Sequence, residues 1–209
     1  MNNTKESRAW YEQLDKNYRN PNNLMTKKMN LVVDLLKDSD KLLDVGCGSG
    51  ELFIRISNKY KKIVGVEINE EAFSILQKKI KGKENATAIK GTVHDVMETD
   101  FDTCVSLDVL EHIDDPAVTA RKIYQLLKND GQYIITVPNW YDFIWSKILK
   151  LNPFHVTFHT IYGWRKILEN AGFEIKLARS VKWPFLKSEF LAKKFPFWGM
   201  CLIFVCKKK

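Results

Sequence analysis

The sequence predicts an α/β fold built on a mostly parallel, doubly wound sheet. Short runs rich in Val, Ile and Leu alternate along the chain with longer segments of helical period. The short runs are continuously apolar, which is typical of strands covered by helices on both faces. A glycine-rich turn separates the first such run from the helical segment after it. These observations predict repeated strand, helix, strand units with right-handed crossovers.

The expected elements before residue 139 follow from hydrophobic period and turn signals. The strands are Lys41 to Val45, Lys62 to Val66, Ala86 to Lys90, Thr103 to Leu107 and Gln132 to Val137. The helices are Leu24 to Lys37, Gly50 to Tyr60, Glu70 to Lys81 and Asp115 to Leu127. The last helix opens with acidic residues and Pro116, the order expected of a cap and a first turn.

The pattern changes after Val137. Trp140 to Leu151 has a helical period with a wide apolar face, and Tyr162 to Asn170 is a second helix that ends at Gly172. The last strands are Phe173 to Val181 and Met200 to Lys207. We expect them to pair as an antiparallel hairpin at one edge, which brings the sheet to seven strands.

Composition excludes several classes of protein. The 209 residues are 45% apolar, which is enough for a well-packed soluble domain and too much for a disordered chain. The cysteines form no CxxC pair and lie in apolar runs, so we expect neither a metal site nor a disulfide framework. Met1 to Arg19 is polar and charged, so we expect no signal peptide, and the longest apolar run, Trp198 to Cys206, is far shorter than the ~20 residues of a membrane span. A cytoplasmic location is expected.

The net charge of +8 is unevenly distributed. Residues 140–209 hold 13 basic and 4 acidic side chains, a balance of +9, and 16 of the 25 aromatic residues. Residues 1–139 are nearly neutral. The excess positive charge therefore lies in the last third of the chain, and it indicates only what that part binds.

The most specific motif is the glycine-rich turn at residues 46–50. Glycine suits this position because the chain turns tightly and a ligand must approach the backbone. Glu67 follows Gly46 by 21 residues, at the end of the second strand. That spacing predicts a carboxylate that accepts hydrogen bonds from ribose hydroxyls. The alternative is a turn with no ligand.

The residues around the turn favour a cationic cofactor over a dinucleotide. A GxGxxG fingerprint would need glycine at position 51, where the chain has Glu51. Asp44 and Asp108 would repel a pyrophosphate, but they would attract a ligand that carries an ammonium and a sulfonium.

Four motifs in order resemble the class I S-adenosylmethionine-dependent methyltransferases. They are LLDVGCGSGE at residues 42–51, GVEI at 65–68, FDTCVSLDVLEHIDDP at 101–116 and LLKNDGQYIITVPN at 126–139. A later stretch, residues 154–173, is more loosely similar to ubiquinone-type small-molecule methyltransferases. The resemblance implies a Rossmann-like sheet and S-adenosylmethionine as the methyl donor.

The resemblance also implies a role for individual residues on the donor side. Gly46, Cys47 and Gly48 would line the methionine part of the cofactor, with Gly50 closing the loop and Asp44 beneath it. Glu67 would hold the ribose and Ile68 would pack on the adenine. Thr92 and Val93 occupy the position of the adenine contact, although the acid usual in the family lies later, at Asp95. Asp108 and Val109 would lie near the transferred methyl group.

Methyl transfer from a sulfonium depends on aligned donor and acceptor atoms and on the exclusion of water more than on a strong acid or base. A hydroxyl or phenol acceptor would still benefit from a base, and histidine titrates near neutral pH. The candidates are His112, His155 and His159, with Glu111 as a carboxylate alternative. Each histidine has a purely structural interpretation as well, and Glu111 has one as an acid at a helix N-terminus.

We expect one domain over residues 1–209. Residues 1–40 form a helical cap, residues 41–139 bind the cofactor, and residues 140–209 form the substrate or lid portion. Its aromatic and basic side chains favour a small apolar or lipid-like acceptor and peripheral contact with an anionic membrane. Core packing and a dimer face are alternative interpretations, so the oligomeric state stays open. An RNA methyltransferase ranks lower because no RNA-binding module is recognised, and a non-catalytic cofactor-binding scaffold is the third class.

Overall fold

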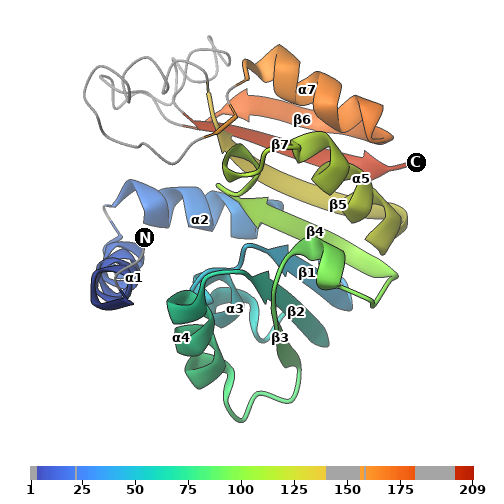
Figure 1. Cartoon of the computed structure of the whole chain (residues 1–209). Coiled ribbons are helices and arrows are strands. Elements are labelled where there is room, and N and C mark those ends of the chain that lie inside the picture. Colours follow the sequence, from blue (N-terminus) through green and yellow to red (C-terminus); the bar gives the residue numbers. More distant parts are fainter. Residues whose placement is uncertain (1–3, 22, 140–155, 158, 182–200) are drawn as a thin grey trace, which may run out of the picture. The chain divides into compact units, whose positions relative to one another are not determined.

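The computed structural model describes residues 4–21, 23–139, 156–157, 159–181 and 201–209. It contains a seven-stranded sheet of order β3-β2-β1-β4-β5-β7-β6 (Figure 1). The strands are β1 (Lys41–Val45), β2 (Lys62–Glu67), β3 (Ala86–Lys90), β4 (Phe101–Leu107), β5 (Leu127–Pro138), β6 (Phe173–Ser180) and β7 (Cys201–Lys208). Strands β1, β2 and β3 pair in parallel, whereas β7 pairs antiparallel with both β5 and β6. The predicted fold class and the antiparallel edge are confirmed.

The helices lie between the strands in the predicted alternation. They are α1 (Thr4–Arg19), α2 (Leu24–Leu35), α3 (Glu51–Ile56), α4 (Glu70–Ile80), α5 (Pro116–Leu126) and α7 (Ile161–Asn170), with short 3₁₀ turns η1 (Val93–Asp95) and η2 (Leu110–His112). The chain divides into two compact units, residues 1–103 and 104–209. We describe each unit by itself.

The first unit gathers three loops at the carboxyl ends of its parallel strands. The loops are residues 46–50 after β1, 67–69 after β2 and 91–95 after β3. Strands β1 and β2 are buried along most of their length, as their apolar sequences predict. Asn69 caps α4 by accepting hydrogen bonds from the amides of Glu71 and Ala72, both at 3.0 Å. The cap fixes where the chain leaves β2 and enters the helix.

Helix α3 is shorter than the predicted helix over Gly50 to Tyr60, and its packing explains why. The helix ends at Ile56, and the Lys59 amide closes a turn onto the Ile56 carbonyl at 2.8 Å. Tyr60 leaves the helix and is buried, with its hydroxyl donating to the Lys37 carbonyl at 2.9 Å. Burying this aromatic ring is worth more than one further helical turn.

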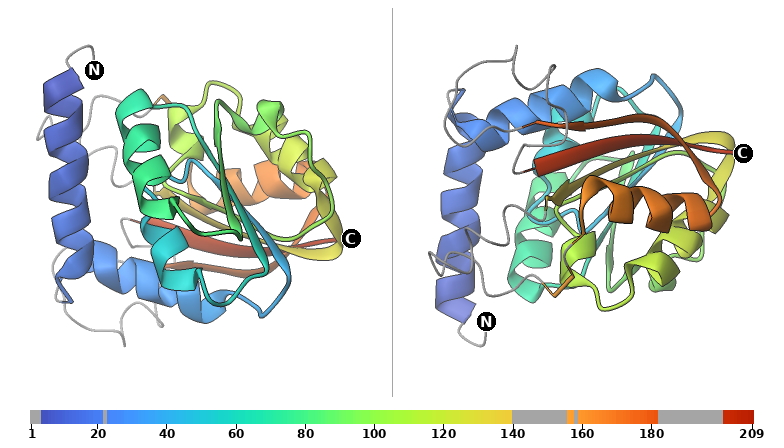
Figure 2. Two further views of the ribbon diagram at one scale, coloured as in Figure 1. Left: turned by 90° about the horizontal axis from the view of Figure 1, so that it is seen from below. Right: turned by 90° about the horizontal axis from the view of Figure 1, so that it is seen from above.

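Helices α1 and α2 precede β1 and run in clearly different directions in both views of Figure 2. The Thr26 hydroxyl on α2 lies 2.9 Å from the Tyr18 carbonyl at the end of α1. Arg55 on α3 donates to the same carbonyl at 2.7 Å and pairs with Glu51 at 2.9 Å. The end of α1 is thereby tied to the helix that follows the glycine-rich turn.

The second unit contains β5, β7 and β6 with α5 and α7, which pack against each other on one face of these strands (Figure 2). Its largest fully buried side chains include Trp164, Tyr133 and Phe204. Asp115 caps α5, accepting from the amides of Ala117 and Val118 at 3.0 Å, as the sequence predicts.

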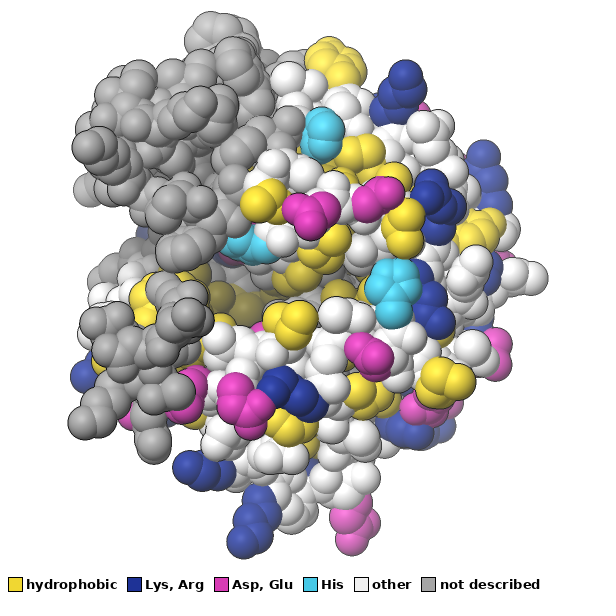
Figure 3. All heavy atoms as spheres, viewed as in Figure 1, with side chains coloured by type: hydrophobic (Ala, Val, Ile, Leu, Met, Phe, Trp, Pro, Cys, Tyr) yellow, Lys and Arg dark blue, Asp and Glu magenta, His cyan; other side chains and the backbone are white. Residues whose placement is uncertain are grey.

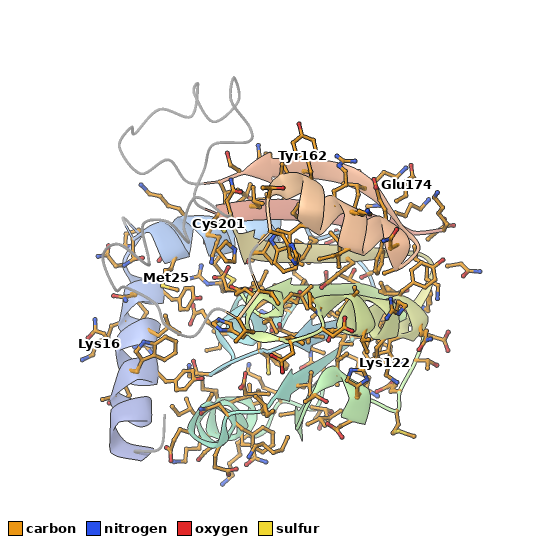
Figure 4. The ribbon with its side chains drawn as sticks, turned by 45° about the horizontal axis from the view of Figure 1, so that its top comes forward. Lys16, Met25, Lys122, Tyr162, Glu174 and Cys201 are labelled. Carbon is orange, nitrogen blue, oxygen red and sulfur yellow. The ribbon has the colours of Figure 1, made fainter. Side chains whose placement is uncertain are left out.

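Strand β5 begins at Leu127, earlier than the predicted Gln132. The Lys208 ammonium donates to the Leu127 carbonyl at 2.6 Å, so the end of β7 holds this extension. Tyr162, in the first turn of α7, is exposed and points into solvent (Figure 4).

Two predicted features lie outside the described residues. They are the apolar helix over Trp140 to Leu151 and the basic, aromatic segment from Lys182 to Phe197. Among the helices that the structure does describe, none combines the length and the apolar character needed to cross a membrane.

Candidate functional site

The glycine-rich turn has the backbone conformation that only glycine adopts easily. Gly46, Gly48 and Gly50 have φ values of 69°, 54° and 84°. The amides of Gly46 and Cys47 both point at the Val66 carbonyl, at 2.8 and 3.2 Å, which ties the turn to the end of β2. A Cβ added at Gly48 would meet nothing within 4 Å, whereas one at Gly50 would lie 2.5 Å from Leu76. Gly50 therefore packs against α4, while the backbone at Gly48 borders open space.

Glu67 is held rigidly at the end of β2. It is only 7% exposed, and its two carboxylate oxygens accept from the backbone amides of Gly48 at 2.8 Å and Asn69 at 2.7 Å. An ionised carboxylate has about four acceptor positions, so each oxygen keeps a second one. Glu67 can thus hold the loop and accept two further hydroxyl hydrogen bonds.

Asp44 on β1 is 3% exposed and lies near Glu67. Burial, followed by the negative charge of Glu67, raises the pKa of Asp44 to about 8. Below that pH the side chain is neutral in the protein without ligand. A cationic ligand would reverse this, because a positive charge nearby favours the carboxylate.

Cys47 lies between Gly46 and Gly48, and its predicted place in the lining of the cofactor site stays a prediction. Its side chain is buried, and burial raises the pKa of the thiol well above its usual range. A thiol of this kind is a poor nucleophile at neutral pH.

The loop after β3 departs from the family pattern in the expected way. The Asp95 carboxylate accepts from the Thr92 amide at 2.7 Å and from its hydroxyl at 3.0 Å, which closes the 3₁₀ turn η1. Thr92 is exposed and Val93 is buried. Ile68 is 68% exposed and presents apolar surface directly after Glu67. An adenine contact by Thr92 and Val93 stays a prediction.

Tyr11 on α1 is a donor-side residue that the motifs do not include. Tyr11, Leu14 and Tyr18 are half-buried and lie on one face of α1, while neighbouring Trp10 is exposed. Burial, followed by the negative charge of Glu67, raises the pKa of the Tyr11 hydroxyl. Its ring therefore lies within electrostatic reach of the donor loop. The i, i+3, i+7 spacing is the sequence signal that would have indicated it.

In the second unit, Asp108 follows β4 in a left-handed backbone conformation with φ 56°. A non-glycine residue there costs about 1 to 3 kcal/mol, and such positions cluster at functional sites. The Thr136 hydroxyl donates to Asp108 Oδ1 at 2.9 Å. Val109 comes next and leads into η2.

The turn η2 brings Glu111 and His112 together. Glu111 is buried and His112 is 40% exposed, with 4.0 Å between Glu111 Oε1 and His112 Nε2. The amides of Val156 and Thr157 donate to the Glu111 carbonyl at 2.9 and 3.1 Å. Glu111 is the acidic residue in the first turn of η2, which precedes α5. Exposed histidine side chains are visible on the face shown in Figure 3.

Of the other two histidine candidates, the structure describes His159 but not His155. His159 packs edge-on against the buried ring of Trp164, with 5.0 Å between ring centroids. Partial burial lowers its pKa, which keeps the ring neutral at neutral pH. His155 lies outside the described residues. In the part of the chain that is described, no cluster of His, Cys, Asp and Glu is placed to hold a metal ion.

The first unit fits the nucleoside part of S-adenosylmethionine. Open space borders the Gly48 backbone, Glu67 keeps acceptor positions for a ribose diol, and Ile68 offers apolar surface for a flat ring. Asp44 provides a carboxyl group for the cationic part. All four of these residues belong to the first unit.

Comparison with known proteins agrees with this arrangement. The family model of the methyltransferase domain matches residues 16–177. Sphingolipid C9-methyltransferase B of Emericella nidulans is 31% identical over 156 residues, which is 68% of this chain and 31% of that protein. The ubiquinone biosynthesis O-methyltransferase of Pseudomonas aeruginosa is 27% identical over 105 residues, 47% of this chain and 44% of that protein. This chain spans less than half the length of either relative.

Solved structures show the same fold at low sequence identity. A TehB-like SAM-dependent methyltransferase from Corynebacterium glutamicum has a TM-score of 0.69 and 19% identity, covering 98% of this chain and 100% of that chain. The [4+2]-cyclase SpnF has a TM-score of 0.66 and 17% identity, covering 87% and 80%. The fold is therefore not restricted to methyl transfer. It is the family match over most of the sequence that shows that this chain belongs to the methyltransferase domain family, among the class I S-adenosylmethionine-dependent methyltransferases.

Proposed function

We propose that this protein transfers the methyl group of S-adenosylmethionine to a small apolar or lipid-like acceptor. The family match and the donor loop support the reaction type. The observation that carries the acceptor class is the concentration of 16 of 25 aromatic residues, with a charge balance of +9, in residues 140–209. Aromatic and basic side chains together suit an acceptor or surface that is apolar with an anionic rim.

The names of two relatives support the same acceptor class. One is a sphingolipid methyltransferase and the other acts in ubiquinone biosynthesis. Neither name assigns a substrate to this chain, because it covers less than half of each protein. They favour testing lipid extracts first.

The bound cofactor would supply a methyl group on a sulfonium, and the residues described here would bind, orient and exclude water. Glu67 and the loop at Gly48 would fix the donor. His112, beside the buried Glu111, would accept a proton from a hydroxyl acceptor, since histidine titrates near neutral pH. His159, neutral at pH 7, is the second candidate for an acceptor contact.

For a hydroxyl acceptor, His112→Gln is expected to lower kcat by about 30-fold and to leave donor affinity unchanged. Removing a general base typically costs at least this much, because the proton must then leave to water. The measurement is steady-state methyl transfer over a range of pH. Lys166→Gln, an exposed change on α7 in the same unit, is the matched control and is expected to have no effect. An unchanged kcat in H112Q would remove His112 from the proposed chemistry.

The acceptor class is tested by transfer of a labelled methyl group into fractionated extracts. We expect label in the lipid or small apolar fraction. Label in RNA alone would support the RNA methyltransferase, and no label anywhere, despite cofactor binding, would support a non-catalytic scaffold. The fold alone does not decide between these outcomes, since a [4+2]-cyclase has a similar fold.

Peripheral contact with an anionic membrane is part of the proposal. Flotation with anionic liposomes at low salt is expected to carry the protein upward, and added salt is expected to release it. Failure to float at low salt would remove the membrane contact and leave a free small-molecule acceptor.

A further inference from the structure

We propose that Arg55 is a positioning residue that holds helix α1 beside the glycine-rich turn and thereby slows release of the methyl donor. The inference rests on the proposed function, because it needs S-adenosylmethionine to bind at that turn. Arg55 lies outside the four motifs that resemble the methyltransferases, which cover residues 42–51, 65–68, 101–116 and 126–139. Every residue that carries the inference belongs to the first unit.

The Arg55 side chain joins three helices. Its Nε donates to Glu51 at 2.9 Å, its Nη1 to the Asn30 side chain at 2.7 Å and its Nη2 to the Tyr18 carbonyl at 2.7 Å. Glu51 is the first residue of α3 and follows Gly50 directly, Asn30 is on α2, and Tyr18 is in the last turn of α1. A planar guanidinium holds its donors in a fixed arrangement, so it sets α1 and α2 relative to the residue that ends the glycine-rich turn.

The contact with α1 falls where that helix needs a donor. The last carbonyls of a helix have no partner within it, and they carry a partial negative charge. The Thr26 hydroxyl lies 2.9 Å from the Tyr18 carbonyl and 3.0 Å from the Asn17 carbonyl, so its single proton is shared between them. Arg55 adds a charged donor at this end, and a shared neutral hydroxyl replaces it poorly.

Helix α1, when held in this way, borders both helices that flank the turn. It packs against α4, and Leu76 of α4 occupies the space that a Cβ at Gly50 would need. Tyr11 lies on the same face of α1 as Tyr18, two turns or about 10 Å along the helix axis. The charge of Glu67 contributes to the raised pKa of Tyr11, which places this face near the donor loop. Release of the Tyr18 end would therefore shift the covering face along its whole length.

A helix held beside a bound ligand affects departure more than arrival. The ligand can enter whenever the helix is displaced, but it leaves only when the helix moves again, so weaker anchoring appears mainly in the dissociation rate. Coupling of this kind is reciprocal, and a bound donor must stabilise the docked helix by the same factor. The inference thus has one kinetic and one structural consequence.

The kinetic test measures release of labelled S-adenosylmethionine from the full chain during a chase with unlabelled ligand. Arg55→Gln is expected to increase the dissociation rate about tenfold and to change the association rate by less than about twofold. Arg55→Lys keeps the charge without the fork and should lie between the two. Lys16→Gln is the matched control, because it removes a positive charge from an exposed position in the last turn of α1. It should release the donor at the unaltered rate.

The structural test is amide hydrogen exchange with and without the donor. In the unaltered protein, the donor is expected to slow exchange in both α1 and the loop after β2. In R55Q the slowing in α1 should be lost while that in the loop remains. Should R55Q fail to fold, Thr26→Val removes the other donor to the Tyr18 carbonyl and is expected to accelerate release about threefold.

The outcomes separate this inference from the proposed function. If the folded, unaltered protein does not bind S-adenosylmethionine, the proposed function fails. If it binds and a folded R55Q releases the donor at the unaltered rate, Arg55 does not position α1 for donor retention. A change in both rate constants with the slowing of exchange in α1 intact would give Arg55 only a structural role and would also overturn the inference.

Discussion

Glu67→Gln is expected to weaken binding of S-adenosylmethionine by at least about 100-fold, because truncating one partner of a buried, charge-assisted contact costs several kcal/mol. The change does more than remove a charge. Both carboxylate oxygens accept from backbone amides, at Gly48 and Asn69. A glutamine must place its NH₂ group against one of those amides, so a donor would face a donor.

The measurement is calorimetric titration of the variant with S-adenosylmethionine, with thermal unfolding to check the fold. Glu70→Gln is the matched control, since it makes the same change nearby on an exposed side chain that pairs with Lys90. It should bind the donor normally. Binding by a folded E67Q as tight as in the unaltered protein would show that the carboxylate does not hold the ribose.

Affinity for S-adenosylmethionine is expected to increase between pH 6 and pH 8 by up to about tenfold per pH unit, and to level off above pH 8. Burial raises the pKa of Asp44 to about 8, so the free protein holds a proton there below that pH. A cationic ligand favours the carboxylate and expels this proton, and proton release on binding makes binding stronger as pH rises. Asp44→Asn should bind with little dependence on pH.

The same group makes a prediction for the free energy of unfolding of the free protein. Between the ordinary pKa of an aspartate and about 8, folded Asp44 keeps a proton that the unfolded chain has lost. Its contribution to stability is therefore fully present at low pH and is lost as the pH rises through 8. D44N should remove this component, which urea titrations at several pH values can measure. An identical pH dependence in D44N would contradict the assignment for both binding and stability.

Much of the fold could be predicted because strands buried on both faces have continuous apolar sequences. The bounds of β1 and β3 agree with the predicted strands residue by residue. The end of α3 could not be predicted in the same way. It depends on Tyr60 leaving the helix to fill the core, which is a tertiary effect that periodicity does not contain.

The residues of the candidate site also divide into those that the sequence predicts and those that it does not. Glu67 could be found from its distance to the glycines, because a βαβ unit has a nearly fixed length. The hydrogen bond from Thr136 to Asp108 could not be predicted, since a threonine within an apolar strand looks like any residue with high strand propensity until its partner is known. Tyr11 depends on how α1 folds back along the first unit, and the sequence alone gives only its helical face. The burial of Glu111 was equally hidden, because a charged side chain is expected to be exposed.

The most direct test of this account is a calorimetric titration of the unaltered protein with S-adenosylmethionine and, separately, with a nicotinamide dinucleotide. The glycine-rich turn, Glu67 and Asp44 predict one molecule of S-adenosylmethionine bound per chain and no measurable binding of the dinucleotide. Absence of S-adenosylmethionine binding by the folded protein, or a preference for the dinucleotide, would contradict the donor site on which the proposed methyl transfer depends.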